Sequence, residues 1–94
     1  MASQIDEITI EYSEDGVKLV NQLDKVVLSK GGWTTIIFKY QDWDRPKEAF
    51  GSEKYSIRRY QKRNGEFVMR SKFNISSKDQ AQKIVGVLNQ WISE

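Results

Sequence analysis

The sequence predicts an α+β fold in which a curved antiparallel sheet of four to five strands is followed by one C-terminal amphipathic helix. Three observations predict it. Short runs of β-branched and aromatic residues, separated by turn signals, occupy residues 8–75. Asn64-Gly65 stands between two such runs, which is typical of a β-hairpin. After Ser77, apolar residues recur at spacings of three and four, which indicates a helix. Residues 1–94 are expected to form a single domain.

The strands are predicted from their β-rich composition. An acidic N-terminal segment, residues 1–18, is expected to hold a short strand at 8–12 that closes at the turn signal Asp15-Gly16. The antiparallel sheet is expected over residues 19–75. Its strands are expected at residues 23–30, 33–43, 54–63 and 66–75. Residues 44–53 are expected to form a polar loop.

The helix is expected over residues 76–94. Ser77 and Gln80 have the spacing of a capping box, in which each side chain satisfies a backbone donor of the other residue. One apolar stripe is formed by Ala81, Ile84, Val85, Leu88, Trp91 and Ile92. A helix end as apolar as the one formed by Leu88, Trp91 and Ile92 needs a partner surface, so we expect these residues at the interface of a symmetric homodimer.

The composition argues against an enzyme. The chain has no cysteine and no histidine, which removes thiolate chemistry and the usual general base of a nucleophilic site. Asp42 and Asp44 alone are too few ligands for a metal ion, so we expect no metal and no cofactor. An acidic N-terminus without a long apolar run is unlike a signal peptide or a membrane span. We therefore expect a cytoplasmic protein with no membrane partner, and association with the nucleoid stays open.

Charge is distributed unevenly along the chain. Residues 1–24 carry six carboxylates and one lysine, a net charge of −5. Residues 54–72 carry seven cations and one glutamate, a net charge of +6. Such asymmetry creates a local positive field although the net charge of the whole chain is only +2.

The turn at Asn64-Gly65 is compatible with two strand registers. A two-residue turn pairs Arg63 with Glu66 and mixes basic residues with Ile57 on one face. A three-residue loop with a bulge pairs Lys62 with Glu66 and separates a mostly apolar face from a basic one. Because the hydrophobic pattern sets strand register, we predict the three-residue loop.

This register predicts what each face of the sheet carries. The apolar face, which we expect the helix to cover, includes Ile57 and Phe73. The basic face includes Arg58, Tyr60, Lys62, Arg70 and Lys72. On the preceding strand, the set that suits the core is Thr34, Ile36, Phe38 and Tyr40. Lys39 and Trp43 are then expected to extend the basic and aromatic surface.

A surface of cations and aromatic rings favours single-stranded nucleic acid as the ligand. Arginine and lysine neutralise phosphates, and aromatic rings stack on unpaired bases of any sequence. We predict binding through Lys39, Trp43, Arg58, Tyr60, Lys62, Arg70 and Lys72. DNA is favoured and RNA stays open. Two alternatives also stay open: a protein-interaction or dimerisation module with a solvated hairpin, and a binder of acidic lipid headgroups.

Several short motifs resemble one known family. The runs LDKVVLSKGGW, KYSIRRY and SKFNISS, the last leading into an amphipathic helix, resemble the transcriptional positive cofactor four (coactivator) family, above all its small bacterial members that bind single-stranded DNA. The resemblance covers residues 19–92. It implies a curved antiparallel sheet, a homodimer formed through the helices and adjoining strands, and single-stranded DNA held on the sheet surfaces.

The resemblance also implies roles for particular residues. Arg58 matches a strand arginine of the family, and Tyr60 matches an aromatic position just beyond it. Arg70 and Lys72 lie where the family has basic residues before the helix. The chain departs from the family at Phe73-Asn74, where lysine-glycine is usual, and residues 3–16 have no counterpart in the family.

Overall fold

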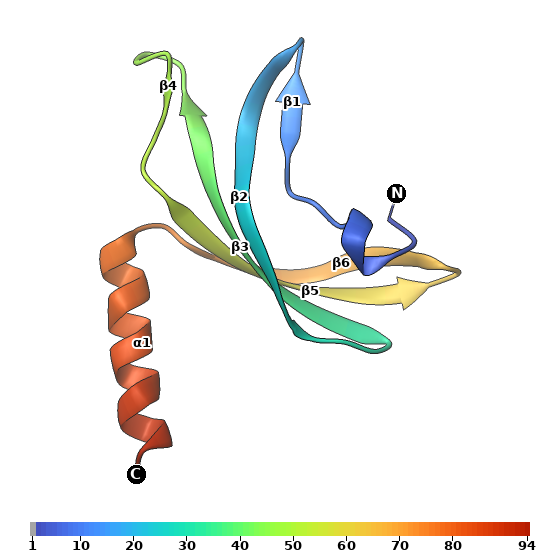
Figure 1. The fold of residues 1–94 in the computed structure, drawn as a ribbon, viewed down its shortest axis with the longest axis vertical. Helices are drawn as coiled ribbons and strands as arrows, with labels where there is room; N and C mark the ends of the chain where they lie inside the picture. The colour runs from blue at the N-terminus through green and yellow to red at the C-terminus, as the bar shows by residue number, and fades with distance from the viewer. Residues whose placement is uncertain (1) are drawn as a thin grey trace.

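A computed structural model describes residues 2–94, which form a curved antiparallel sheet followed by one C-terminal helix (Figure 1). The predicted fold class is therefore confirmed. The strands are β1 (Tyr12–Glu14), β2 (Val17–Ser29), β3 (Trp33–Asp44), β4 (Ala49–Phe50), β5 (Lys54–Arg63) and β6 (Glu66–Ile75), and the helix is α1 (Lys78–Ile92). The strand order is β1-β2-β3-β5-β6, with β4 paired to the end of β3. No helix of residues 2–94 is long and apolar enough to cross a membrane.

The N-terminal strand begins later than the sequence predicts. Pairing starts at Tyr12, and Asp15 and Gly16, both at positive φ, form the turn into β2. Residues 8–11, predicted as strand, are extended but are not part of the sheet. Ile8 and Ile10 are instead buried in the core. The alternation of Ile8, Thr9 and Ile10 shows that one side of this segment is buried. A strand has such a buried side, and so has an extended segment that packs on a sheet, so the alternation does not distinguish the two.

The core lies on one face of the sheet, which we call the inner face. On β3, Thr34, Ile36, Phe38 and Tyr40 point to this face and are all buried, as predicted. The N-terminal segment, residues 2–10, covers the inner face and contributes Ile8 and Ile10 to the core. The opposite side of the sheet is the outer face.

Hydrogen bonds hold the N-terminal segment against the sheet. Lys25 Nζ donates to the carbonyl oxygens of Ile5 at 2.6 Å and Ile8 at 2.8 Å. The backbone N–H of Phe67 on β6 donates to the carbonyl oxygen of Ala2 at 2.8 Å. These bonds satisfy polar groups that would otherwise be buried without partners, so the acidic segment is an integral part of the fold.

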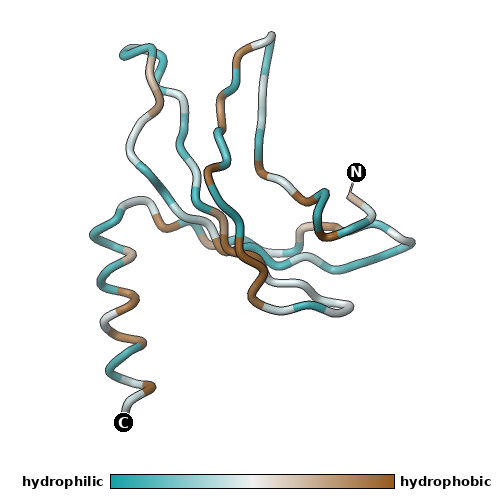
Figure 2. The backbone as a smooth tube through the Cα atoms, in the orientation of Figure 1, coloured by the Kyte–Doolittle hydropathy of each residue, from teal (hydrophilic) through white to brown (hydrophobic). Residues whose placement is uncertain are grey.

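Helix α1 leaves the sheet instead of covering it (Figure 1). Ser77 caps it by accepting a hydrogen bond from the Gln80 N–H, while the Gln80 side chain accepts one from the Ser76 N–H. No residue of α1 is buried, and Trp91 and Ile92 are 64% and 78% exposed. The apolar stripe runs uncovered along the helix (Figure 2). The prediction that the helix covers the apolar face of its own sheet is wrong.

The predicted hairpin register is also wrong. Arg63 pairs with Glu66 across a two-residue turn, because Asn64 and Gly65 both adopt positive φ, the conformation that matches the twist of the two strands. A bulge lies further along, at Arg70, where pairing shifts between Arg59 and Tyr60. The bulge lets Ile57 face Phe73.

The outer face exposes a row of apolar side chains. Direct strand pairs align Val26, Ile37, Ile57 and Phe73 across β2, β3, β5 and β6. Phe73 is 54% exposed, and neither Ile37 nor Ile57 is fully buried. We call these four residues the outer apolar row. The apolar face expected from Ile57 and Phe73 exists, but no segment of residues 2–94 covers these side chains.

Candidate nucleic-acid interface

Between Arg58 and Lys72, the β5–β6 hairpin divides six cations equally between its two faces. Strand pairing and side-chain contacts put Arg58, Lys62 and Lys72 on the inner face and Arg59, Arg63 and Arg70 on the outer face. Arg70 continues the alternation of Phe67, Val68 and Met69 and lies on the outer face, where its Nε donates to Gln61 Oε1 at 3.1 Å. The hairpin carries one carboxylate, Glu66.

None of these six cations forms a salt bridge within residues 2–94. The three salt bridges of this range join Lys18 to Glu11 at 3.0 Å, Lys39 to Glu53 at 3.5 Å and Lys54 to Asp42 at 3.0 Å. All three lie outside the segment from Arg58 to Lys72. The positive charge of the hairpin is therefore not neutralised within the described chain.

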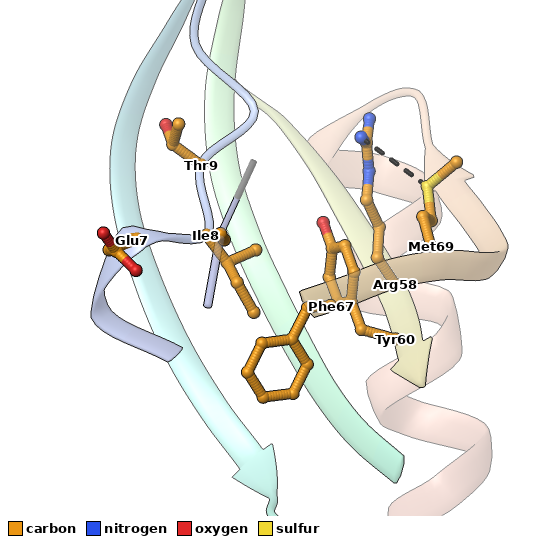
Figure 3. Close-up of a pocket in the computed structure, with 8 residues that line it drawn as sticks. Glu7, Ile8, Thr9, Arg58, Tyr60, Phe67 and Met69 are labelled. Carbon is orange, nitrogen blue, oxygen red and sulfur yellow. Dashed lines mark hydrogen bonds between the residues drawn. The ribbon is translucent and has the colours of Figure 1, made fainter. Parts of the chain in front are cut away.

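An open cavity of about 640 Å³, which we call the inner groove, separates the hairpin from the N-terminal segment (Figure 3). Its lining residues are Ala2, Glu7, Ile8, Thr9, Arg58, Tyr60, Phe67 and Met69. Lys72 pairs directly with Arg58, and Lys62 Nζ lies 5.4 Å from the centre of the Phe67 ring. The groove therefore combines phosphate-binding groups with apolar side chains.

A short hydrogen-bond chain orients Arg58. Its Nε donates to Ser56 Oγ at 3.1 Å, and the Ser56 hydroxyl donates to Asn74 Oδ1 at 2.7 Å. Its Nη1 lies 3.9 Å from the sulfur of Met69, the contact drawn as a dashed line in Figure 3. Ser56 is fully buried. These contacts hold the Arg58 side chain in a fixed position at the groove.

Tyr60 lies beside Arg58 on β5 but is only 7% exposed (Figure 3). It pairs with Thr34, so it shares the inner face with the core of β3. Burial raises the pKa of Tyr60 above that of a solvated phenol, and the charge of Arg58 opposes this only in part. The exposed position that we expected for Tyr60 is wrong: the ring forms the floor of the groove. Phe67, which the sequence analysis did not select, is a partly exposed ring at the same groove.

The structure separates the remaining predicted residues from this site. Lys39 lies on the outer face, where its partner is Glu53. Trp43 lies near the end of β3, and its ring contacts Phe50 edge-on at 5.1 Å. Arg70 lies on the outer face of the hairpin. The inner face thus brings together Arg58, Tyr60, Lys62 and Lys72 but not Lys39, Trp43 or Arg70.

A second cluster, missed in the sequence analysis, occupies the outer face of the hairpin. The guanidinium carbon of Arg59 lies 4.5 Å from the centre of the Trp33 ring, a cation–π contact. Trp33 pairs with Gln61, which accepts the hydrogen bond from Arg70. We call Trp33, Arg59, Gln61, Arg63 and Arg70 the outer tip surface.

Comparison of the chain with models of protein families, with curated proteins and with solved structures finds no match. The fold and the placement of side chains therefore have to carry the functional argument.

Proposed function

We propose that this chain is a cytoplasmic, non-enzymatic protein that binds single-stranded nucleic acid, preferably DNA, with little sequence preference, through the inner groove and the adjoining cations of the β5–β6 hairpin. One observation carries the proposal. Six of the seven cations of the hairpin, all of them between Arg58 and Lys72, form no salt bridge within residues 2–94. Cations without a salt-bridge partner have no ion pair to break when they bind phosphates. Each phosphate that they neutralise releases counterions, and this release favours binding.

The shape of the groove favours a single strand over a duplex. Arg58, Lys62 and Lys72 are arranged along one side of the hairpin, where they can follow a sugar-phosphate backbone. Phe67 and Met69 offer apolar contacts to unpaired bases. The N-terminal segment lines the other side of the groove. The motif resemblance to single-stranded DNA-binding proteins supports the same ligand class.

Replacing Lys72 with alanine should weaken binding of labelled oligo-dT several-fold and lower the dependence of log affinity on log salt by about 0.7, the value for one phosphate contact. Lys72 is exposed and its side chain makes no hydrogen bond or salt bridge within the described residues, so the substitution should leave folding intact. Fluorescence anisotropy at two salt concentrations, with a matching duplex and a single-stranded RNA as competitors, measures both quantities.

Lys39→Ala is the matched control, because Lys39 lies on the outer face and is paired with Glu53. It should bind oligo-dT like the wild type. If K39A weakened binding and K72A did not, the ligand would lie on the opposite side of the sheet. Equal affinity for oligo-dT and duplex would contradict the preference for single strands.

A specific observation also favours dimerisation as a second function. Ile84, Val87, Leu88 and Trp91 line an apolar groove on α1 that no other part of the described chain covers. The outer apolar row is uncovered as well. We propose that a symmetric homodimer buries the end of the helix stripe, including Leu88, Trp91 and Ile92, because exposed apolar patches of this kind usually mark an interface.

The wild-type chain should therefore sediment at about 22 kDa, twice its 11.0 kDa mass, at tens of micromolar. Trp91→Ser should shift the equilibrium toward the monomer, because the substitution removes the largest ring of the exposed stripe. Gln82→Ser, a change outside the stripe, should leave the mass unchanged. A wild-type mass near 11 kDa in sedimentation equilibrium would refute the dimer.

A further inference from the structure

The outer tip surface has the chemistry of a ligand site that is separate from the inner groove. Trp33 remains 43% exposed although Arg59 covers part of its ring. Arg70 donates through Nε to Gln61, and its terminal nitrogens have no partner in the described chain. Glu66 lies opposite Arg63, but no salt bridge joins them. An exposed ring thus lies among three arginines.

The bulge in β6 connects this surface to the inner groove. Without it, Arg70 and Lys72 would share one face, because side chains two residues apart in a strand point the same way. Counted from the turn, Arg70 alternates to the outer face, and the bulge that follows brings Lys72 to the inner face opposite Arg58. β6 is the edge strand of the sheet, so no further strand pairs with its free side. Arg70 and Lys72 therefore lie on opposite faces of the sheet at the same open edge.

We propose that the outer tip surface is a second binding site for single-stranded nucleic acid, so that a strand leaving the inner groove passes over the edge of β6 and continues on the outer face. This proposal rests on the function proposed above. Arg70 binds the phosphate that follows the edge, with its guanidinium oriented by Gln61. An unpaired base stacks on the layer formed by Trp33 and Arg59, since both an indole ring and a guanidinium plane accept a base.

A comparison of two oligomer lengths tests the proposal. An oligo-dT of about 6 nucleotides can fill the inner groove alone, whereas one of about 20 nucleotides can reach both faces. The double variant Arg59→Ala, Arg70→Ala should bind the short oligomer within about twofold of the wild type and the long one about 10-fold more weakly. Its salt dependence for the long oligomer should fall by about 0.7, the value for the one phosphate that Arg70 binds. Lys72→Ala should weaken both lengths.

Fluorescence reports the stacked base directly. The long oligomer should quench the tryptophan emission of the wild type, and Trp33→Phe should remove most of this quenching, because stacking on an indole quenches its emission. The short oligomer should cause little quenching in either protein. Thermal unfolding of each variant identifies any loss of binding that comes from misfolding.

Each outcome decides between the two proposals. If the double variant binds both lengths like the wild type while K72A weakens both, the outer site is refuted and the inner groove stands. If the double variant weakens both lengths equally, the outer surface is not a continuation of the groove, and the proposed path is wrong. If the wild type binds neither oligomer, the proposed function fails as well.

Discussion

Replacing Phe38 with alanine should lower the free energy of unfolding by about 3–5 kcal/mol, the typical cost of deleting a buried aromatic side chain. Phe38 is 0% exposed and lies in the middle of β3, between Lys25 of β2 and Ser56 of β5. The cavity left by the ring would be surrounded by sheet on one side and by the N-terminal segment on the other, so it could not collapse easily. Urea denaturation followed by circular dichroism measures the change.

Phe73→Ala is the matched control for this prediction. The same ring is removed, but Phe73 is 54% exposed on the outer face, so the loss should be below about 1.5 kcal/mol in a dilute, monomeric sample. If F38A does not fold, Phe38→Leu should still show the larger loss of the two positions. Equal losses at Phe38 and Phe73 would mean that a single chain buries both faces of the sheet.

The parts of the fold with strong local signals could be predicted from the sequence. Strands β5 and β6 begin and end at the predicted residues, because Asn64-Gly65 defines the turn and β-rich runs flank it. Helix α1 begins directly after Ser77, the predicted cap. These features depend on neighbouring residues only, so a single sequence contains the information that specifies them.

The position of α1 could not be predicted, because it depends on contacts between distant segments. A stripe with a spacing of three and four shows which side of a helix is apolar but not what that side contacts. Only Ser76 and Ser77 separate β6 from α1. The direction that the chain takes at these two residues cannot be read from the spacing of apolar residues along the helix. The helix was therefore assigned to the nearest apolar face, which the structure leaves uncovered.

The candidate site was predicted in part, for a related reason. Arg58, Lys62 and Lys72 are correctly grouped on one face. Arg58 and Lys62 each lie two residues from Tyr60 in the same strand, and Lys72 pairs with Arg58. Arg70 is predicted on the wrong face because the three-residue loop shifts β6 by one residue against β5, and the bulge at Arg70, which contains no glycine and gives no sequence signal, compensates for this shift only beyond that residue. Arg59 shares the face of Ile57 in either register, but its contact with Trp33 depends on the pairing of β3 with β5, which the hairpin pattern does not report.

Replacing Ile8 with alanine should lower the free energy of unfolding by about 2–5 kcal/mol, although the residue lies in an acidic segment outside the strands. Ile8 is buried against the core of β3, lines the inner groove, and its carbonyl oxygen accepts a hydrogen bond from Lys25. The substitution should also weaken oligo-dT binding, because loosening the segment removes one wall of the groove. Denaturant unfolding and anisotropy on the same sample measure the two effects.

Leu28→Ala provides the control for Ile8→Ala, because it shortens an aliphatic side chain that is 56% exposed on β2. Its cost should stay below about 1 kcal/mol, since most of this side chain already contacts water. If I8A were as mild as L28A, the N-terminal segment would be a dispensable addition to the sheet. If I8A instead destabilised the protein but tightened oligo-dT binding, the segment would compete with the ligand for the inner face, and the groove would not be the binding surface in its present form.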